Sequence, residues 1–184
     1  MGIDLIQDTR TQRFRALVLP HLDAAYNLAR WLLRNDADAQ DVAQEAYLRA
    51  FRFFDGFQGD DARAWLLAIV RNRCYSWIDD HRRFAQSHDP EVDVDGMAQS
   101  ATRAEPETDP QALVSSQQDR QRVDRALASL PLDFREVLVL REIEDLSYKE
   151  IATVLDMPIG TVMSRLSRAR SMLAGRLSED GRGG

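Results

Sequence analysis

The chain has 184 residues, of which 44% are hydrophobic and 29% charged, and its formal net charge is −6 at pH 7. This length and apolar content suit one globular domain or two small ones. The negative net charge argues against indiscriminate nucleic-acid binding, because a DNA duplex attracts proteins chiefly through its phosphates. A DNA-binding surface would therefore need a local concentration of basic residues.

The sequence offers no signal for membrane insertion, for secretion or for a metal site. No apolar run approaches the ~20 residues that a membrane-spanning helix needs, and the N-terminal segment, with Asp4 and Asp8, lacks the layout of a signal peptide. We therefore expect a cytoplasmic protein. Cys74 is the only cysteine, which excludes an internal disulfide and a multi-cysteine metal site. We expect it to be a small buried hydrophobic residue, and we expect no cofactor.

An acidic segment divides the chain. Residues 86–116 hold seven acidic residues, one basic residue (Arg103) and few large apolar side chains. Such a segment buries too little surface to offset the entropy lost on ordering. The flanking segments show helical rather than alternating periodicity and no internal repeat. We predict an all-α protein with two small helical domains, residues 10–85 and 117–178, joined by a flexible acidic linker at residues 86–116.

The front domain begins with two predicted helices. Apolar residues recur with helical spacing over residues 14–33, and Asn35-Asp36 offers a stop followed by a new helix cap. In the second helix, residues 36–54, acidic side chains gather on one side. That side carries Asp38, Asp41 and Glu45, flanked by Gln44 and Leu48, and another, broad side carries Ala39, Val42, Ala43, Ala46, Ala50 and Phe53. Such an acidic face is most often simply solvated, and its functional interpretation is a docking face for a basic partner.

The next predicted helix alternates aromatic and basic residues. A turn at residues 57–61 precedes a helix that continues to Arg83. Aromatic rings stack on the bases of a single DNA strand while arginines hold its phosphates. Trp65 and Ile69, one turn apart, are expected to be structural. Asn72 follows on the same stripe, and its amide either recognises a base edge or bonds a neighbouring loop.

A helix-turn-helix is predicted near the C-terminus. Ser147 and Glu150 form the S-x-x-E pattern of a capping box, which places the first helix from Tyr148 onward. The stretch 157–160 interrupts the pattern. We expect Thr161 to cap the second helix, with Gly160 taking an unusual backbone angle just before it.

The second helix of this pair has two unlike faces. Its apolar side carries Val162, Leu166, Ala169 and Leu173, and its polar side carries Ser164, Arg165, Arg168 and Ser171. A recognition helix inserts such a polar face into the major groove, where the arginine fork can bond guanine O6 and N7. The alternative is an amphipathic helix with arginines on its solvated face.

In this order, the motifs resemble a bacterial RNA polymerase sigma factor of the extracytoplasmic-function (ECF) type. The resemblance rests on D-A-Q-D-V-A-Q-E at residues 38–45, the aromatic and basic helix, L-P-x-x-x-R-E-V at residues 130–137 and the helix-turn-helix. It covers about residues 14–83 and 122–177. The resemblance implies a protein that binds core RNA polymerase, directs promoter-specific transcription initiation, recognises the minus-35 and minus-10 elements and helps to melt DNA.

The resemblance also implies roles for individual residues. Contact with core polymerase, through the beta-prime coiled coil and the beta subunit, falls to Asp38, Asp41, Gln44, Glu45 and Leu48. Contact with the minus-10 element falls to Phe57, Arg71, Asn72, Arg73, Tyr75, Ser76, Arg82 and Arg83. Contact with the minus-35 element falls to Thr161, Ser164, Arg165, Ser167 and Arg168, beside Met163, where family members often carry arginine. An anti-sigma protein that clamps the two domains is implied as a further partner.

Two other classes of protein compete with this interpretation. A helix-turn-helix repressor or activator would bind duplex DNA as a dimer, but it would need a dimerisation element and would leave the acidic helix unexplained. An enzyme would need a recognisable site. The sequence has no P-loop and no Gly-x-Ser-x-Gly, and His21, His81 and His88 lack a nucleophile or metal partner, so we predict no catalytic residue.

Overall fold

The computed structural model describes residues 2–87 and 110–180, and within these ranges the chain is helical, with no strand. The predicted all-α class is confirmed. Most of the expected linker, residues 88–109, lies outside the described residues. The helical elements are α1 (Gly2–Val18), η1 (Leu19–His21), α2 (Leu22–Leu33), α3 (Asp36–Phe53), η2 (Phe54–Gly56), α4 (Ala62–Ser87), α5 (Pro110–Ala128), α6 (Leu132–Leu138), the π-helical turn η3 (Val139–Ile143), α7 (Tyr148–Leu155) and α8 (Ile159–Asp180).

The stop and cap predicted at residues 35–36 are present between α2 and α3. Arg34 ends α2 in the left-handed conformation, with φ of 60°. The Asn35 side chain then accepts hydrogen bonds from the backbone N–H groups of Ala37 (2.9 Å) and Asp38 (3.2 Å). Because these N–H groups have no partner inside the helix, the cap fixes where α3 begins.

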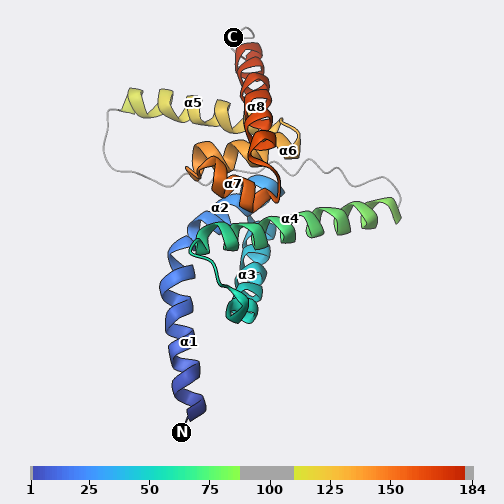
Figure 1. Cartoon of the computed structure of the whole chain (residues 1–184). Helices are drawn as coiled ribbons and strands as arrows, with labels where there is room; N and C mark the ends of the chain where they lie inside the picture. The colour runs from blue at the N-terminus through green and yellow to red at the C-terminus, as the bar shows by residue number, and fades with distance from the viewer. Residues whose placement is uncertain (1, 88–109, 181–184) are drawn as a thin grey trace.

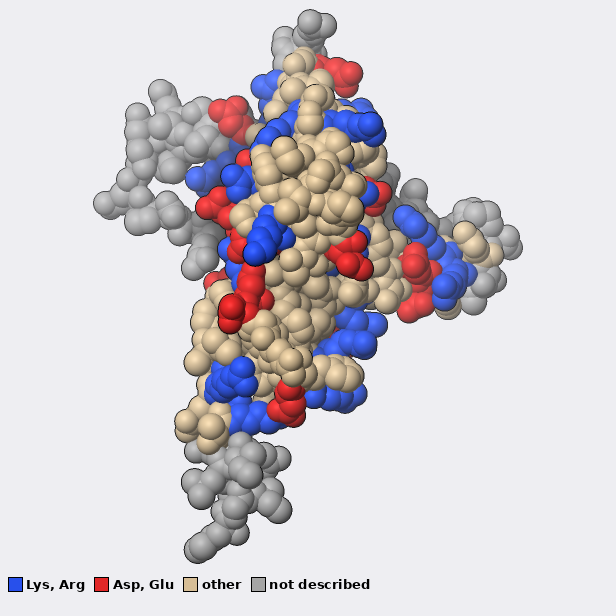
Figure 2. All heavy atoms as spheres, in the orientation of Figure 1, with Lys and Arg blue, Asp and Glu red and all other residues tan. Residues whose placement is uncertain are grey.

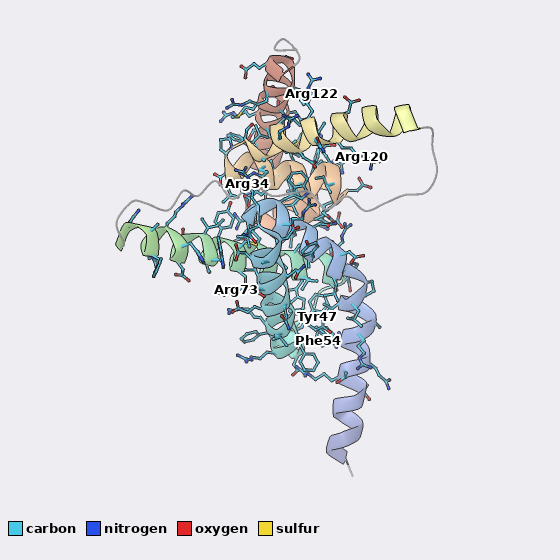
Figure 3. All side chains as sticks on the ribbon, turned by 180° about the vertical axis from the view of Figure 1, so that it is seen from behind. Arg34, Tyr47, Phe54, Arg73, Arg120 and Arg122 are labelled. Atoms are coloured by element: carbon cyan, nitrogen blue, oxygen red, sulfur yellow. The ribbon has the colours of Figure 1, made fainter. Side chains whose placement is uncertain are left out.

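Aromatic side chains join α1 to the end of α3. The Phe14 ring meets the rings of Tyr47, Phe51 and Phe54 edge-on, with centroids 5.1, 5.0 and 5.1 Å away. Tyr47 and Phe54 lie close together between α3 and α1 (Figure 3). Edge-to-face pairs of this kind stabilise a core beyond the area they bury. They attach α1 to the domain formed by α2, α3 and α4.

The C-terminal domain comprises α5 to α8. Helix α5 begins at Pro110, so residues 110–116, which the sequence analysis assigned to the linker, are helical. Proline is well tolerated in the first turn of a helix, because its missing N–H would have no helical partner there. The Arg122 guanidinium on α5 donates a hydrogen bond to the Leu177 carbonyl, which joins α5 to α8.

The two domains pack against each other. In Figure 1, α6 and α7 lie over α2 and the first half of α4, while the rest of α4 and the end of α8 extend away from the body. The buried apolar side chains form one cluster that runs through both domains, from Phe14 to Ala169. The surfaces expected to bind DNA and polymerase therefore lie on one particle in which the two domains are packed together, which we call the closed particle.

Candidate nucleic-acid and polymerase interface

The helix-turn-helix is formed by α7 and α8. Ser147 Oγ accepts a hydrogen bond from the Glu150 N–H (3.2 Å), and the Ser147 N–H donates to Glu150 Oε2 (2.6 Å), so the predicted capping box is confirmed. These bonds lower the pKa of the Glu150 carboxyl. Ile151, Val154 and Leu155 are buried, as their spacing indicated. The cap thus fixes the start of the helix that supports α8.

The turn between α7 and α8 differs from the predicted one. Asp156 takes the left-handed conformation, with φ of 50°, and α8 already begins at Ile159. The Pro158 carbonyl accepts from the N–H groups of Thr161 (2.9 Å) and Val162 (3.1 Å). Thr161 therefore lies inside the first turn rather than capping it, and Gly160 has no positive φ. The prediction was wrong because Asp156, whose short polar side chain tolerates this conformation, makes the reversal.

Helix α8 presents most of the predicted minus-35 residues to solvent. Val162, Leu166 and Ala169 are buried, whereas Thr161, Ser164, Ser167 and Arg168 are exposed. Met163, beside them, is 53% exposed. Arg165 differs, because its guanidinium is half-buried and its Nη1 lies 3.5 Å from Glu136 Oε1. Figure 2 shows basic side chains along α8 at the top and on the protruding end of α4 at the right.

Helix α3 carries the predicted acidic face. Asp41, Gln44 and Glu45 are exposed, Asp38 is half-buried, and Leu48 is 59% exposed. Glu45 is paired with Arg73 of α4 (2.5 Å), and Figure 3 shows Arg73 where α4 passes α3. The predicted apolar face is buried through Ala39, Val42, Ala46 and Ala50. Phe53, which periodicity placed in the core, is instead 54% exposed beside Arg49, and the next residue, Phe54, is buried.

A pocket lies between α3 and α4. It has a volume of about 350 Å³. Its lining residues are Arg49, Phe53, Trp65, Ile69, Asn72, Arg73 and Ser76. Three of these (Asn72, Arg73 and Ser76) were predicted as minus-10 contacts, whereas Arg49 and Phe53 were missed. Their one-turn spacing on α3, which allows the Arg49 guanidinium to cover the Phe53 ring at 5.4 Å, is the signal that could have found them.

The remaining predicted minus-10 residues lie in three different surroundings. Phe57 is only 7% exposed, and its ring packs on Trp65 with centroids 4.9 Å apart. The Phe57 ring is therefore part of the hydrophobic core. Arg82 and Arg83 are exposed on the free end of α4. Arg71 and Tyr75 face the C-terminal domain and not the pocket. The structure therefore brings only part of the predicted set together.

Arg71 and Tyr75 surround a buried carboxylate. Glu136 on α6 is 0% exposed. Its Oε2 accepts from Arg71 Nε (2.9 Å) and from the Tyr75 hydroxyl (2.9 Å), and its Oε1 accepts from Arg71 Nη2 (3.3 Å). Burial raises the pKa of Glu136 and of Tyr75, while bonding to Glu136 raises the pKa of Arg71 although burial opposes it. Sequence periodicity gave no indication of this cluster.

Two more residues of the C-terminal domain, Arg135 and Glu144, form hydrogen bonds with the front domain. Glu144 is buried, and its Oε2 accepts from Arg63 Nη2 (3.0 Å) while its Oε1 accepts from the Asn27 amide (3.3 Å). Arg135 donates to the carbonyls of Trp31 (3.0 Å) and Leu130 (3.0 Å). Burial and the charge of Arg34 lower the pKa of Arg135 to about 10. Because Trp31 lies in the last turn of α2, Arg135 bonds one of the carbonyls that a helix end leaves free.

The described residues also bear on metal binding and on membrane insertion. Over residues 2–87 and 110–180, no group of three or more His, Cys, Asp or Glu side chains is placed to hold a metal ion. Among those residues, no helix has the length and apolar character to cross a membrane. Cys74 is buried, as expected, and burial raises the pKa of its thiol to about 12.

Known protein families match both domains. Residues 17–84 match the family model of sigma-70 region 2, and residues 120–173 match that of sigma-70, region 4. The ECF RNA polymerase sigma-E factor of Escherichia coli (strain K12) is 38% identical over 137 residues, covering 74% of this chain and 72% of that protein. The RNA polymerase sigma-H factor of Pseudomonas aeruginosa is 31% identical over 172 residues, or 93% and 89% of the two chains.

Solved structures also resemble this chain. The sigma factor RpoE, in complex with the anti-sigma factor NepR from Bartonella quintana, superposes with a TM-score of 0.75 and 28% identity over 91% of this chain and 98% of its own. CnrH, in complex with the cytosolic domain of CnrY, superposes with a TM-score of 0.63 and 27% identity over 92% and 90%. Both superpositions extend across the two domains of this chain.

Proposed function

Because this chain belongs to the ECF RNA polymerase sigma factors, we propose a division of labour among its surfaces in promoter-specific transcription initiation. Residues 10–85 bind core polymerase and the minus-10 element, and residues 117–178 bind the minus-35 element. Residues 86–116 join the two domains. The chain acts in the cytoplasm by binding alone and has no catalytic residue. The dimeric helix-turn-helix regulator loses its support, since it accounts for only one of the two matched domains.

The polymerase-docking surface is the acidic face of α3. One observation carries this proposal: Asp41, Gln44 and Glu45 are exposed together beside Leu48, which is 59% exposed. A solvated face gains nothing from displaying a large apolar side chain, whereas interfaces combine a buried apolar contact with a polar rim. A basic partner surface with an apolar centre, such as the family's beta-prime coiled coil, fits these side chains, with the beta subunit as a second contact.

The minus-10 surface is the pocket side of α4. Asn72, Arg73 and Ser76 line the pocket together with the aromatic side chains of Phe53 and Trp65. An unstacked base needs an aromatic or apolar wall and one or two hydrogen-bonding groups at its edge, while a guanidinium holds the phosphate. Arg82 and Arg83 continue the basic surface along the free end of α4. Arg71, Tyr75 and Phe57 complete the proposed minus-10 set, although none of them faces the pocket in the closed particle.

The minus-35 surface is the exposed face of α8. Ser164, Ser167 and Arg168 point away from the core, and Thr161 lies in the first turn, where backbone N–H groups suit a phosphate. Arg168 is the base contact that we favour, because its guanidinium is exposed. Arg165 also belongs to the proposed minus-35 set. It lies at the edge of this face, and its guanidinium is paired with Glu136.

We further propose an anti-sigma protein as a regulator of this chain. RpoE and CnrH, which superpose over 91% and 92% of this chain, were solved in complex with an anti-sigma factor and with the cytosolic domain of CnrY, respectively. The shared arrangement supports a partner that holds both domains. Co-purification of the tagged chain from its own cells, followed by identification of a stoichiometric inhibitor, tests this proposal. A fully active chain with no such partner under any growth condition would contradict it.

The docking proposal is tested by reversing charge on α3. The double variant Asp41→Lys, Glu45→Lys should bind core polymerase at least about tenfold more weakly, because like charges across an interface cost several kcal/mol. Binding is measured by fluorescence anisotropy of the labelled full chain titrated with core enzyme. The matched control is Asp23→Lys, Asp119→Lys, which makes the same change in net charge at exposed positions on α2 and α5.

Circular dichroism of both double variants checks that the helices remain. A selective loss in the α3 variant supports the docking face. Equal weakening by the two double variants would mean that net charge, and not the face of α3, governs the interaction, and unchanged binding in both would place the docking surface elsewhere.

A further inference from the structure

Among the described residues, the Glu136 side chain accepts more hydrogen bonds across the domain interface than any other side chain does. Arg71 and Tyr75 reach it from α4 of the front domain, and Arg165 reaches it from α8 of its own domain (3.5 Å). The Tyr75 hydroxyl also lies 3.3 Å from Asp133 Oδ1 on α6. One fully buried carboxylate thus holds residues from both helices that are proposed to contact DNA.

The two sides of this cluster differ in strength. Arg71 makes two hydrogen bonds to Glu136, of 2.9 and 3.3 Å, and Tyr75 adds a third of 2.9 Å, whereas Arg165 makes a single long contact. A buried carboxylate needs such partners, since removing one leaves an uncompensated charge. If the domains separate, Glu136 keeps only Arg165 and becomes accessible to water. The cluster therefore favours the closed arrangement without being required for either domain alone.

Two neighbouring contacts hold the same interface. Arg135, next to Glu136, donates to the Trp31 carbonyl of α2, and Arg63 of α4 donates to both the side chain and the backbone carbonyl of Glu144 (3.0 and 2.6 Å). Three residues, Arg135 and Glu136 of α6 and Glu144 directly after η3, thus bond to α2 and α4. They fix the orientation of the domains as well as their proximity.

The closed arrangement conflicts with simultaneous promoter contact. The minus-10 and minus-35 elements are centred roughly 25 base pairs apart, or roughly 85 Å along B-form DNA at ~3.4 Å per pair. In the closed particle, α4 and α8 are joined through the single side chain of Glu136. Arg71 and Tyr75 are also already bonded to a carboxylate, whose charge and oxygen acceptors resemble those of a DNA phosphate.

We propose that Glu136 is an intramolecular latch. In the free chain it occupies Arg71 and Tyr75 in place of DNA, and polymerase or promoter binding must separate the domains before α4 can use these two residues. This inference rests on the proposed division of DNA contacts. The pocket side of α4, with Asn72 and Ser76, lies outside the latch, so closure withholds one edge of the minus-10 surface and leaves the other accessible.

The latch is tested by measuring the distance between the domains in the free full-length chain. Dyes attached at Arg52→Cys and Ser178→Cys, both exposed positions on α3 and α8, report opening by resonance energy transfer, and buried Cys74 is protected from labelling. Arg71→Gln removes the charged donor from the front-domain side. We expect the population of the open form to rise at least about tenfold, as loss of hydrogen bonds to a charged group predicts.

The matched control acts on the same carboxylate from the other side. Arg165→Gln removes the donor that belongs to the same domain as Glu136, so it should leave energy transfer close to that of the parent chain. Tyr75→Phe removes only a hydroxyl and should open the chain to a smaller extent than Arg71→Gln. Circular dichroism confirms that each variant is folded. Equal opening by Arg71→Gln and Arg165→Gln, or no opening by Arg71→Gln, would overturn the latch.

A second readout links opening to DNA. Glu136→Gln frees Arg71 and Tyr75 without deleting them, so the free chain should bind fluorescein-labelled oligo(dT) several-fold more tightly, whereas Arg71→Gln should open without this gain. Unchanged binding by a folded, open Glu136→Gln chain would mean that the latch withholds no DNA contact. Energy transfer is measured without polymerase or DNA, so failure of the latch in that experiment is distinct from failure of the docking or promoter assignments.

Discussion

Helices α4 and α8 are both long and amphipathic, and both carry arginines proposed to contact DNA, yet they present them differently. On α8, Arg168 is exposed and lies between exposed serines. On α4, Arg71 is half-buried and bonded to Glu136, while Asn72, the next residue, lines an open pocket. Adjacent positions of one helix thus face the other domain of the chain and a candidate DNA surface. Arginine content alone does not distinguish a DNA contact from an internal one.

The difference arises from what each helix packs against. Helix α8 buries one face on its own domain and keeps the other free, as a recognition helix must. Helix α4 is covered on one side by α3 and on another by α7 of the other domain. Its polar residues are consequently divided among the pocket, the domain interface and the free end.

Truncation of Glu136 should have the largest effect on stability. Glu136→Ala removes the partner of Arg71 and Arg165 in a buried cluster, so we expect it to lower the free energy of unfolding by ~3–5 kcal/mol. Glu142→Ala breaks the exposed pair between Glu142 and Arg170 (2.7 Å) and should cost only ~0.2–1 kcal/mol. Urea denaturation measures both variants. Similar losses would show that the cluster at Glu136 is energetically an ordinary surface pair.

Truncation of Arg168 should affect recognition and not folding. Arg168→Ala is expected to cost ~1–3 kcal/mol of discrimination at one position of the minus-35 element and to leave the unfolding midpoint unchanged, because its side chain is exposed. Binding of the polymerase complex to a set of single-base promoter variants measures the preference. A uniform loss over all variants would indicate that Arg168 contacts only phosphate.

The burial of Cys74 on α4 should appear as a pH dependence of stability. Its pKa rises from 9.0 to about 12 on folding, so the folded chain holds the thiol proton more tightly than the unfolded chain. The stabilisation is fully present below pH 9 and declines above it by ~1.4 kcal/mol per pH unit. Denaturant unfolding between pH 9 and 10 should show a shallower decline for Cys74→Ala. Parallel declines in the two chains would refute the assignment to this thiol.

The helix cap of α7 should have a smaller effect. Ser147→Ala removes the acceptor for the Glu150 N–H and should lower stability by ~1 kcal/mol. The control, Ser171→Ala, deletes a hydroxyl that donates to the Ser167 carbonyl within α8 and should change stability by less than ~0.5 kcal/mol. Thermal unfolding followed by circular dichroism compares them. An equal loss of stability in the two variants would show that the Ser147 cap contributes no more than an ordinary hydroxyl within a helix.

Local sequence signals predicted much of the architecture. Asn35 and the pair Ser147 and Glu150 marked true helix starts, because capping depends on residues only two or three positions apart. Helical spacing also identified the exposed acidic residues of α3. Gly160 misled the prediction of the turn, because glycine permits a left-handed backbone without requiring it, and Asp156 took that conformation instead.

Features that depend on distant partners were not predicted. Phe53 fits the apolar stripe of α3 by spacing, but its neighbour Phe54 is the residue that is buried, at 1% exposed, and nothing local shows which of the two enters the core. Arg71 and Glu136 are separated by 65 residues, with the acidic linker between them, so no periodicity connects them. Arg71 and Tyr75 look like DNA contacts in isolation, and only the packing of the two domains shows what they bond.

In vitro transcription with purified core polymerase over a promoter library tests the assignment of this chain most directly. We predict transcripts only when chain and core enzyme are both present, and only from promoters that share one upstream and one downstream element, with the upstream preference altered by Arg168→Ala. Binding of the chain alone to an intact palindrome, without any dependence on core polymerase for promoter selection, would contradict the account.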